Sequence, residues 1–189
     1  MKKLIDYILK FGKLNKQQTD FIVSKATMLT LPKDEYFLEA GKIPKQIAFV
    51  LDGVLRFSYH NSKGEEITNF FIDGNQFVTD YLKFNANVAA SEYLQAVSDC
   101  KLLIFSKKDW DEILNTIVGW DKIVEKMYKK YLLETIEKRS ILVSGDATTR
   151  YLLFMEKYPT LVNRIPLSYI ASYLEITQQS LSEIRKSGH

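Results

Sequence analysis

The stretch RIPLSYIASYLEITQQSLSEIRK, residues 164–186, carries two helical apolar patterns separated by a three-residue corner. Four residues of the first pattern follow the i, i+3, i+4, i+7 spacing of one helical face: Leu167, Ile170, Ala171 and Leu174. The corner, EIT, ends at Thr177, which is a favourable N-cap for a second helix. That second helix turns Leu181 and Ile184 inward. The stretch therefore predicts two short helices joined by a tight turn.

Polar side chains cover the remaining face of the second helix. Glutamine bonds adenine through its major-groove edge, and hydroxyls, arginine and a helix N-terminus hold phosphates. The candidate DNA-contacting residues are Gln178, Gln179, Ser180, Ser182, Glu183, Arg185 and Lys186. An ordinary helical hairpin with a solvated outer face has the same pattern, so both interpretations stay open on these residues alone.

Upstream, the chain from about residue 25 to residue 106 has the pattern of short strands between evenly spaced turns. Gly41, Gly53, Gly64 and Gly74 each stand in a turn-like context between aromatic and β-branched runs. This spacing is typical of a β-sandwich or barrel. In the segment NSKG, Gly64 supplies the positive φ angle that a tight hairpin turn requires.

From Lys107 the pattern becomes helical, and a long run without proline follows Gly119. Its approximate apolar stripe consists of Val124, Met127, Tyr131 and Ile136. Two surfaces suit this stripe. One is the chain's own β domain, and the other is the same helix of a second copy, because symmetric dimers are the commonest oligomers. One helix can serve both roles.

The composition of the chain excludes several function classes. The 189 residues include one cysteine and two histidines, with a formal net charge of +3. One cysteine forms no internal disulfide, and no His or Cys cluster has metal-ligand spacing. No nucleophile–base pair or glycine-rich phosphate loop is present, and no apolar run is long enough to span a bilayer. We expect a cytoplasmic protein that has no cofactor, metal or membrane partner and is not an enzyme.

The skeleton IPL…IA.YL.IT…LS.IRK in residues 165–186 resembles the DNA-binding segment of the cyclic-AMP-receptor/fumarate-nitrate regulator (Crp/Fnr) family of transcription factors. The stretch FLEAGKIPKQIAFVLDGVLRFSY, residues 37–59, resembles the front of that family's β-roll. The resemblance implies an α+β fold: an N-terminal jelly-roll domain over residues 1–119, a connecting and dimerisation helix over 120–143, and a helix-turn-helix domain over 144–189. It also implies a homodimer that binds a palindromic operator in double-stranded DNA. Val124, Met127 and Tyr131 are then the expected dimer interface.

The effector pocket that the resemblance implies departs from the family's pattern. It corresponds to Phe77, Thr79, Asp80, Tyr81, Ala90 and Ser91. Thr79-Asp80 stands where nucleotide-binding members have Gly-Glu, and Ala90-Ser91 stands where they have an Arg before Ser or Thr. Alanine cannot neutralise a phosphate, and a buried anion without its cation is strongly disfavoured. We therefore predict that cyclic AMP does not bind. The pocket is expected to hold another small molecule or to be filled by its own aromatics, with Tyr81, Phe84 and Tyr93 as candidates.

Two further departures concern the tail. Glu175 stands at the turn position where the family usually has Gly, and Glu183 stands where it often has a guanine-reading Arg. From residue 144 onward five Lys or Arg residues face four Asp or Glu residues, a net charge of only +1. These features favour an alternative function: a ligand-sensing or protein-interaction module with a weak or relic DNA-binding domain.

Overall fold

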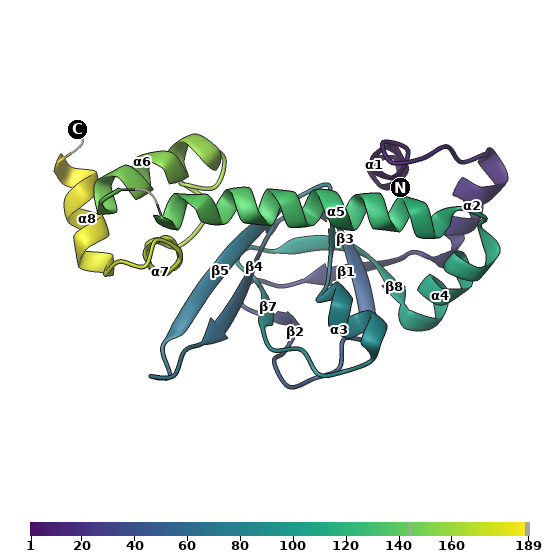
Figure 1. Cartoon of the computed structure of the whole chain (residues 1–189), viewed down its shortest axis with the longest axis horizontal. Helices are drawn as coiled ribbons and strands as arrows, with labels where there is room; N and C mark the ends of the chain where they lie inside the picture. The colour runs from purple at the N-terminus through teal and green to yellow at the C-terminus, as the bar shows by residue number, and fades with distance from the viewer. Residues whose placement is uncertain (144, 188–189) are drawn as a thin grey trace.

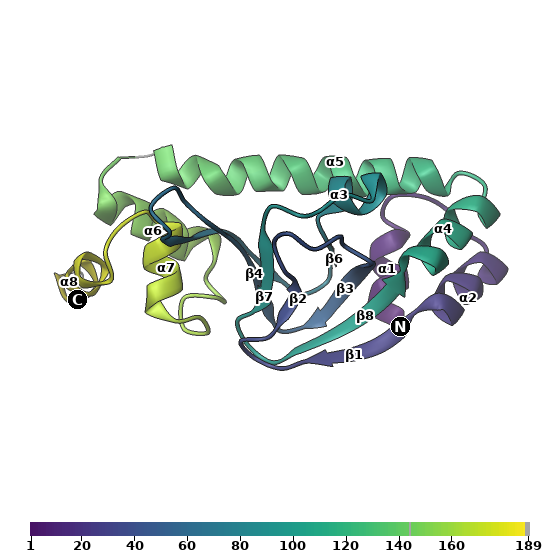
Figure 2. The same ribbon diagram turned by 90° about the horizontal axis from the view of Figure 1, so that it is seen from below.

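The computed structural model describes residues 1–143 and 145–187. Two packed β-sheets lie between N-terminal helices at one end and C-terminal helices at the other (Figures 1 and 2). One long helix, α5 (Trp120–Arg139), runs along the molecule past the sheets. None of the helices in this part of the chain combines the length and apolarity that crossing a bilayer requires.

Each sheet contains four antiparallel strands, and together they form the β-roll. The first sheet has the order β1-β8-β3-β6 and the second β2-β7-β4-β5. The strands are β1 (Thr27–Leu31), β2 (Tyr36–Leu38), β3 (Gln46–Asp52), β4 (Val54–His60), β5 (Glu66–Asp73), β6 (Phe77–Val78), β7 (Tyr93–Ala96) and β8 (Cys100–Ser106). The predicted β region and the mixed helix-and-sheet fold are therefore confirmed.

The hairpin between β4 and β5 is the one that the sequence predicts at NSKG. Gly64 has a φ of 78°, which a residue with a side chain rarely adopts. The backbone N–H of Gly64 donates to the Asn61 carbonyl, and the N–H of Asn61 donates to the Glu65 carbonyl. In the strand order of its sheet, β5 pairs only with β4 and is therefore an edge strand.

The helices other than α5 are short. They are α1 (Lys2–Ile8), α2 (Lys16–Lys25), α3 (Tyr81–Ala86), α4 (Lys107–Thr116), the 3-10 turn η1 (Ser140–Val143), α6 (Ala147–Lys157), α7 (Leu167–Tyr173) and α8 (Gln178–Ser187). Ser106 and Asp146 cap α4 and α6 by accepting from backbone N–H groups, a role for which Ser and Asp are favourable residues. The predicted domain boundaries stay predictions, and Ser144, Gly188 and His189 of the third predicted domain lie outside the described residues.

The stripe on α5 corrects the predicted dimer interface. Val124 and Met127 are buried, and Tyr131 is half-buried. The Tyr131 ring packs edge-on against Phe70 of β5, with 6.0 Å between ring centroids. These three residues thus face the chain's own β-roll, which is the other surface that suits an apolar stripe. Ile136, the fourth residue of the predicted stripe, is 67% exposed and does not share this buried face. Helical periodicity identified the buried face of α5, but periodicity alone does not say which surface covers it.

The hydrophobic core joins the β-roll to the C-terminal helices. One continuous cluster of buried side chains includes Leu55 and Phe71 from the sheets together with Phe154, Ile170 and Leu181 from α6, α7 and α8. A second cluster packs α1, α2, α4 and the first half of α5 on the sheet that contains β3 and β8. The C-terminal helices are therefore packed onto the β-roll instead of being tethered beside it.

Candidate functional site

A left-handed turn joins α7 to α8. Glu175 has a φ of 55°, which is strained for a residue other than glycine. This is the turn position at which the sequence has Glu in place of the family's usual Gly. The Ile176 N–H donates to the Ala171 carbonyl, and the Ser180 N–H donates to Thr177 Oγ1 at 3.0 Å. Leu181 is completely buried and anchors α8. The two short helices and the tight turn that the sequence predicts are thus present.

The predicted DNA-contacting residues lie on α8, and most of them are open to solvent. Gln178, Gln179, Glu183, Arg185 and Lys186 are exposed, whereas Ser180 and Ser182 are partly buried. The structure therefore presents a polar helix surface at one end of the molecule, as Figure 1 shows for α8.

Two contacts organise that polar surface. Gln179 Nε2 donates to Glu183 Oε1 at 3.3 Å, so the carboxylate orients one glutamine amide. The hydroxyls of Ser180 and Thr177 are 2.8 Å apart and hydrogen-bonded. Ser180 is therefore engaged in capping α8, while Gln178, Arg185 and Lys186 have free side chains within the described part of the chain.

The residues of the predicted effector pocket do not all come together at one place. Asp80 caps α3 by accepting from the Lys83 N–H. Ala90 is buried, and its backbone pairs with the loop at Gly41 and Lys42. Ser91 is exposed to solvent.

Glu92, the residue that follows Ser91, is an acid whose side chain is partly buried. Asn69 Nδ2 donates to Glu92 Oε1 at 2.6 Å, and Arg139 Nη1 donates to Asn69 Oδ1 at 2.5 Å. Burial raises the pKa of the Glu92 carboxyl, and the charge of Asp80 raises it further. Acidic groups near this position disfavour an anionic ligand such as a cyclic phosphate.

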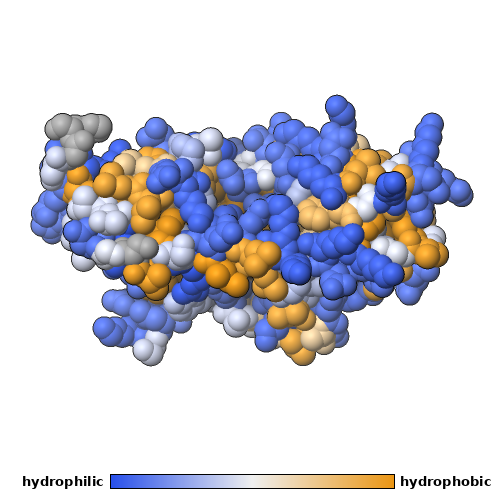
Figure 3. Space-filling view, turned by 45° about the horizontal axis from the view of Figure 1, so that its top comes forward, coloured by the Kyte–Doolittle hydropathy of each residue, from blue (hydrophilic) through white to orange (hydrophobic). Residues whose placement is uncertain are grey.

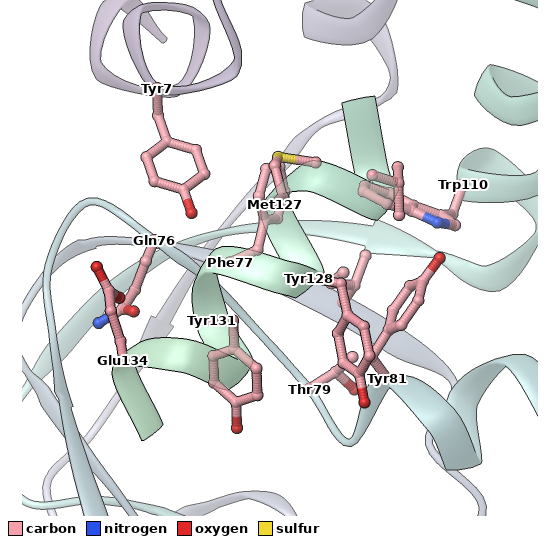
Figure 4. Close-up of a pocket in the computed structure, with 12 residues that line it drawn as sticks. Tyr7, Gln76, Phe77, Thr79, Tyr81, Trp110, Met127, Tyr128, Tyr131 and Glu134 are labelled. Carbon is pink, nitrogen blue, oxygen red and sulfur yellow. The ribbon is translucent and has the colours of Figure 1, made fainter. Parts of the chain in front are cut away.

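Three of the predicted pocket residues, Phe77, Thr79 and Tyr81, line a cavity between the β-roll and α5 (Figure 4). Val124, Met127 and Tyr131 form its α5 wall, together with Tyr128. Tyr7, Trp110 and Glu134 also line the cavity. No sequence pattern predicted them, because they come from α1, α4 and the far half of α5. Burial and the charge of Glu134 raise the pKa of Tyr7 to about 12, so its hydroxyl is neutral.

The cavity is small. Its volume is about 50 Å³, whereas an engineered protein cavity that binds benzene has about 150 Å³. The ring of Tyr128 lies beside that of Tyr81 at the cavity (Figure 4), with 5.3 Å between centroids, and the Tyr131 ring is 6.2 Å from that of Tyr128. Of the three aromatic residues predicted to fill the pocket, Tyr81 lines the cavity, and Phe84 is buried and stacks on Tyr81. Tyr93 lies elsewhere and packs on Tyr36 and His60. The walls as they stand do not accommodate a nucleotide.

A family model covers the β-roll. Residues 28–117 match the cyclic nucleotide-binding domain. No curated protein sequence matches the chain.

Solved structures resemble the chain over most of its length. The c-di-GMP responsive global regulator CLP of Xanthomonas campestris has 14% identity and a TM-score of 0.73, over 92% of this chain and 91% of that chain. FixK2 of Bradyrhizobium japonicum has 15% identity and a TM-score of 0.70, over 86% of this chain and 83% of that chain. A transcriptional regulator of the crp/fnr family from Eubacterium rectale has 14% identity and a TM-score of 0.71, over 92% and 83%. The resemblance of the sequence to that family is thereby confirmed at the level of the fold.

Proposed function

Since residues 28–117 belong to the cyclic nucleotide-binding domain family and the whole chain has the fold of Crp/Fnr regulators, we propose that the protein is a homodimeric DNA-binding transcription regulator. It acts in the cytoplasm through its β-roll, α5 and the helix-turn-helix formed by α7 and α8. It carries out no catalysis. No group of three or more His, Cys, Asp or Glu side chains among the described residues is arranged to hold a metal ion.

The observation that carries this proposal is the exposed polar face of α8 at the end of the molecule. Two copies related by a dimer axis would enter successive major grooves about 34 Å apart. Gln178, Gln179, Ser182 and Glu183 would then face bases. Ser180, through the helix N-terminus, would approach the DNA backbone together with Arg185 and Lys186.

Dimerisation is supported by the side of α5 that faces away from the β-roll. Leu132, Leu133 and Ile136 are 41%, 53% and 67% exposed. On the side of the molecule where α5 lies, apolar surface alternates with hydrophilic side chains (Figure 3). Large apolar side chains at helical spacing on one long helix suit a two-fold pairing with the same helix of a second copy.

Random-site selection followed by fluorescence anisotropy tests DNA binding. Wild type is expected to enrich a palindrome. Gln179→Ala should lose about 5- to 150-fold in affinity for the selected site, the range for one base contact. Arg185→Ala should weaken binding to all sequences and lower the slope of log affinity against log salt by about one. Gln17→Ala and Lys16→Ala, on exposed positions of α2, serve as matched controls. The absence of any enriched palindrome would count against the proposal.

The regulating signal that we propose is an unidentified effector or partner other than cyclic AMP. The side chain at position 90 is that of alanine, which supplies no cation for a phosphate, and the neighbouring Glu92 is an acid whose pKa is raised by burial. Isothermal titration calorimetry with cyclic AMP should show no binding in the low micromolar range. A clear titration in that range would refute this part of the proposal.

A second candidate function is a ligand or protein-interaction module whose DNA-binding surface is weak. The Gln179–Glu183 hydrogen bond favours it, because a carboxylate on the polar face of α8 repels phosphates. Salt-dependent affinity for the selected DNA distinguishes the two functions, since only phosphate contacts release counterions.

A further inference from the structure

The outer face of the β2-β7-β4-β5 sheet is covered by the C-terminal helices of the same chain. Phe71 of β5 is completely buried, and its ring contacts Phe154 of α6 and Tyr173 of α7, with centroids 6.2 Å and 5.6 Å away. The Tyr173 hydroxyl donates to the Lys138 carbonyl at the end of α5 at 2.7 Å. Separating the helices from the sheet would expose these rings to water, which opposes separation.

Ser172 of α7 hydrogen-bonds backbone groups on the free edge of β5. Because β5 is the last strand of its sheet, some of its backbone groups lack a neighbouring strand. The Thr68 N–H donates to Ser172 Oγ at 2.9 Å, and the Ser172 hydroxyl donates to the Glu66 carbonyl at 3.1 Å. One hydroxyl thus supplies both the acceptor and the donor that a paired strand would offer.

An arginine on β4 provides a second anchor. Arg56 is only 2% exposed, and its guanidinium donates to Gln95 Oε1, Thr68 Oγ1 and Glu66 Oε1 at 2.7–3.2 Å. The remaining face of the guanidinium lies 3.8 Å from the centre of the Tyr169 ring of α7. Since the β-roll itself holds the guanidinium in place, Arg56 is a preformed platform on which Tyr169 stacks.

This contact leaves the polar face of α8 free. The side chains that dock, Tyr169, Ser172 and Tyr173, belong to α7, whereas Gln178, Gln179 and the basic end of α8 are exposed in the docked state. The contact therefore sets the orientation of α8 without covering it.

We propose that the docking of Tyr169 and Ser172 of α7 onto Arg56 and the edge of β5 is a positioning contact that holds α8 in its DNA-binding orientation. The inference rests on the proposed function. In a dimer both α8 helices must reach their half-sites together, and a fixed orientation lowers the entropic cost of engaging the second half-site. The docked state is, in this proposal, the DNA-binding state and not an inhibited one.

The test uses the double variant Tyr169→Ala/Ser172→Ala, in which both substituted residues belong to α7 and no residue of the β-roll is replaced. Docking is read by amide hydrogen exchange at Thr68 in the single variant Tyr169→Ala, because the Thr68 N–H donates to Ser172 and this variant keeps that acceptor. Exchange at Thr68 is expected to accelerate at least tenfold. Affinity for the selected palindrome should fall about tenfold or more, while affinity for an isolated half-site stays at the wild-type value. Tyr169→Phe, which keeps the ring over Arg56, is the matched control and should behave as wild type.

Three outcomes would overturn the inference: an unchanged affinity for the palindrome, a raised affinity, which would mean that docking inhibits DNA binding, or an equal loss on the half-site. Failure of the proposed function is recognised separately. If the proposed function is wrong, wild type itself selects no palindrome, and the inference is then wrong as well. If wild type selects a palindrome and the double variant binds it with unaltered affinity, only the inference is wrong.

Discussion

Gly53 joins β3 to β4 at a point where the chain has no room for a side chain. Its φ is 99°, and a Cβ added there would lie 2.6 Å from both the Asp99 carbonyl oxygen and Cys100 Sγ. Gly53→Ala should therefore lower the free energy of unfolding by roughly 2–4 kcal/mol, of which about 1 kcal/mol comes from the backbone conformation and the rest from overpacking. Urea unfolding followed by circular dichroism measures the change.

Gly41 is the matched control for that substitution. It has a φ of 83° with no heavy atom within 4 Å of an added Cβ, so Gly41→Ala should cost only the backbone contribution of about 1 kcal/mol. Equal losses at the two positions would show that the close approach of Asp99 and Cys100 to Gly53 has no energetic consequence.

Cys100 is a buried, neutral thiol. Burial is the main cause that raises its pKa to about 11, and its Sγ donates to the carbonyls of Ser98 and Val54. At pH 8 only about one thiol in a thousand is then ionised, and the thiolate is the reactive form. Native protein should resist iodoacetamide at this pH and react fully once unfolded, as intact mass measurement can follow. Modification of the folded protein at the rate of free glutathione would contradict this assignment.

The turn between α7 and α8 carries a strain that can be removed. A non-glycine residue at the φ of Glu175 costs on the order of 1 kcal/mol. Glu175→Gly should therefore raise the free energy of unfolding by about that amount, measured by urea denaturation. Glu175→Gln keeps the backbone strain and removes only the charge, so its stability should match wild type. A similar gain in both variants would place the cause in the charge and not in the backbone.

Local features of these elements could be predicted from the sequence because neighbouring residues determine them. The helix caps at Ser106, Asp146 and Thr177 each depend on a hydrogen bond that spans three residues. The positive φ at Glu175 follows from the shortness of the turn. The polar face of α8 follows from helical periodicity alone.

The cavity and the surface that covers α5 required the tertiary structure. The stripe of Val124 and Met127 is an apolar helix face, and an apolar face packs equally well on a sheet or on a second helix. Tyr7 reaches the cavity from α1, more than a hundred residues before α5 in the chain. No spacing in the sequence encodes such a contact, so only Phe77, Thr79 and Tyr81 of the predicted pocket residues are among those that line the cavity.

Across the protein, the β-roll and the C-terminal helices share one hydrophobic core, which the order of elements along the chain does not reveal. The hydrogen bonds of Ser172 to Thr68 and Glu66 join residues that are 104 and 106 positions apart in sequence. The burial of Phe71 beneath α6 and α7 packs the β-roll and the C-terminal helices against one another.

The proposed dimer would pair through the outward side of α5, where Ile136 is 67% exposed. Burying an isoleucine contributes roughly 1.5–3 kcal/mol, and a two-fold interface buries it twice. Ile136→Lys should therefore raise the dimer dissociation constant by about a hundredfold or more, measured by sedimentation velocity over a concentration series. Met28→Lys on β1 changes a comparably exposed apolar residue, at 56%, and should leave the dimer intact. Because a palindrome is engaged by two α8 helices at once, Ile136→Lys should also lower affinity for the palindrome more than for a half-site. A wild-type protein that sediments as a monomer at every concentration would remove the basis for two-fold DNA recognition.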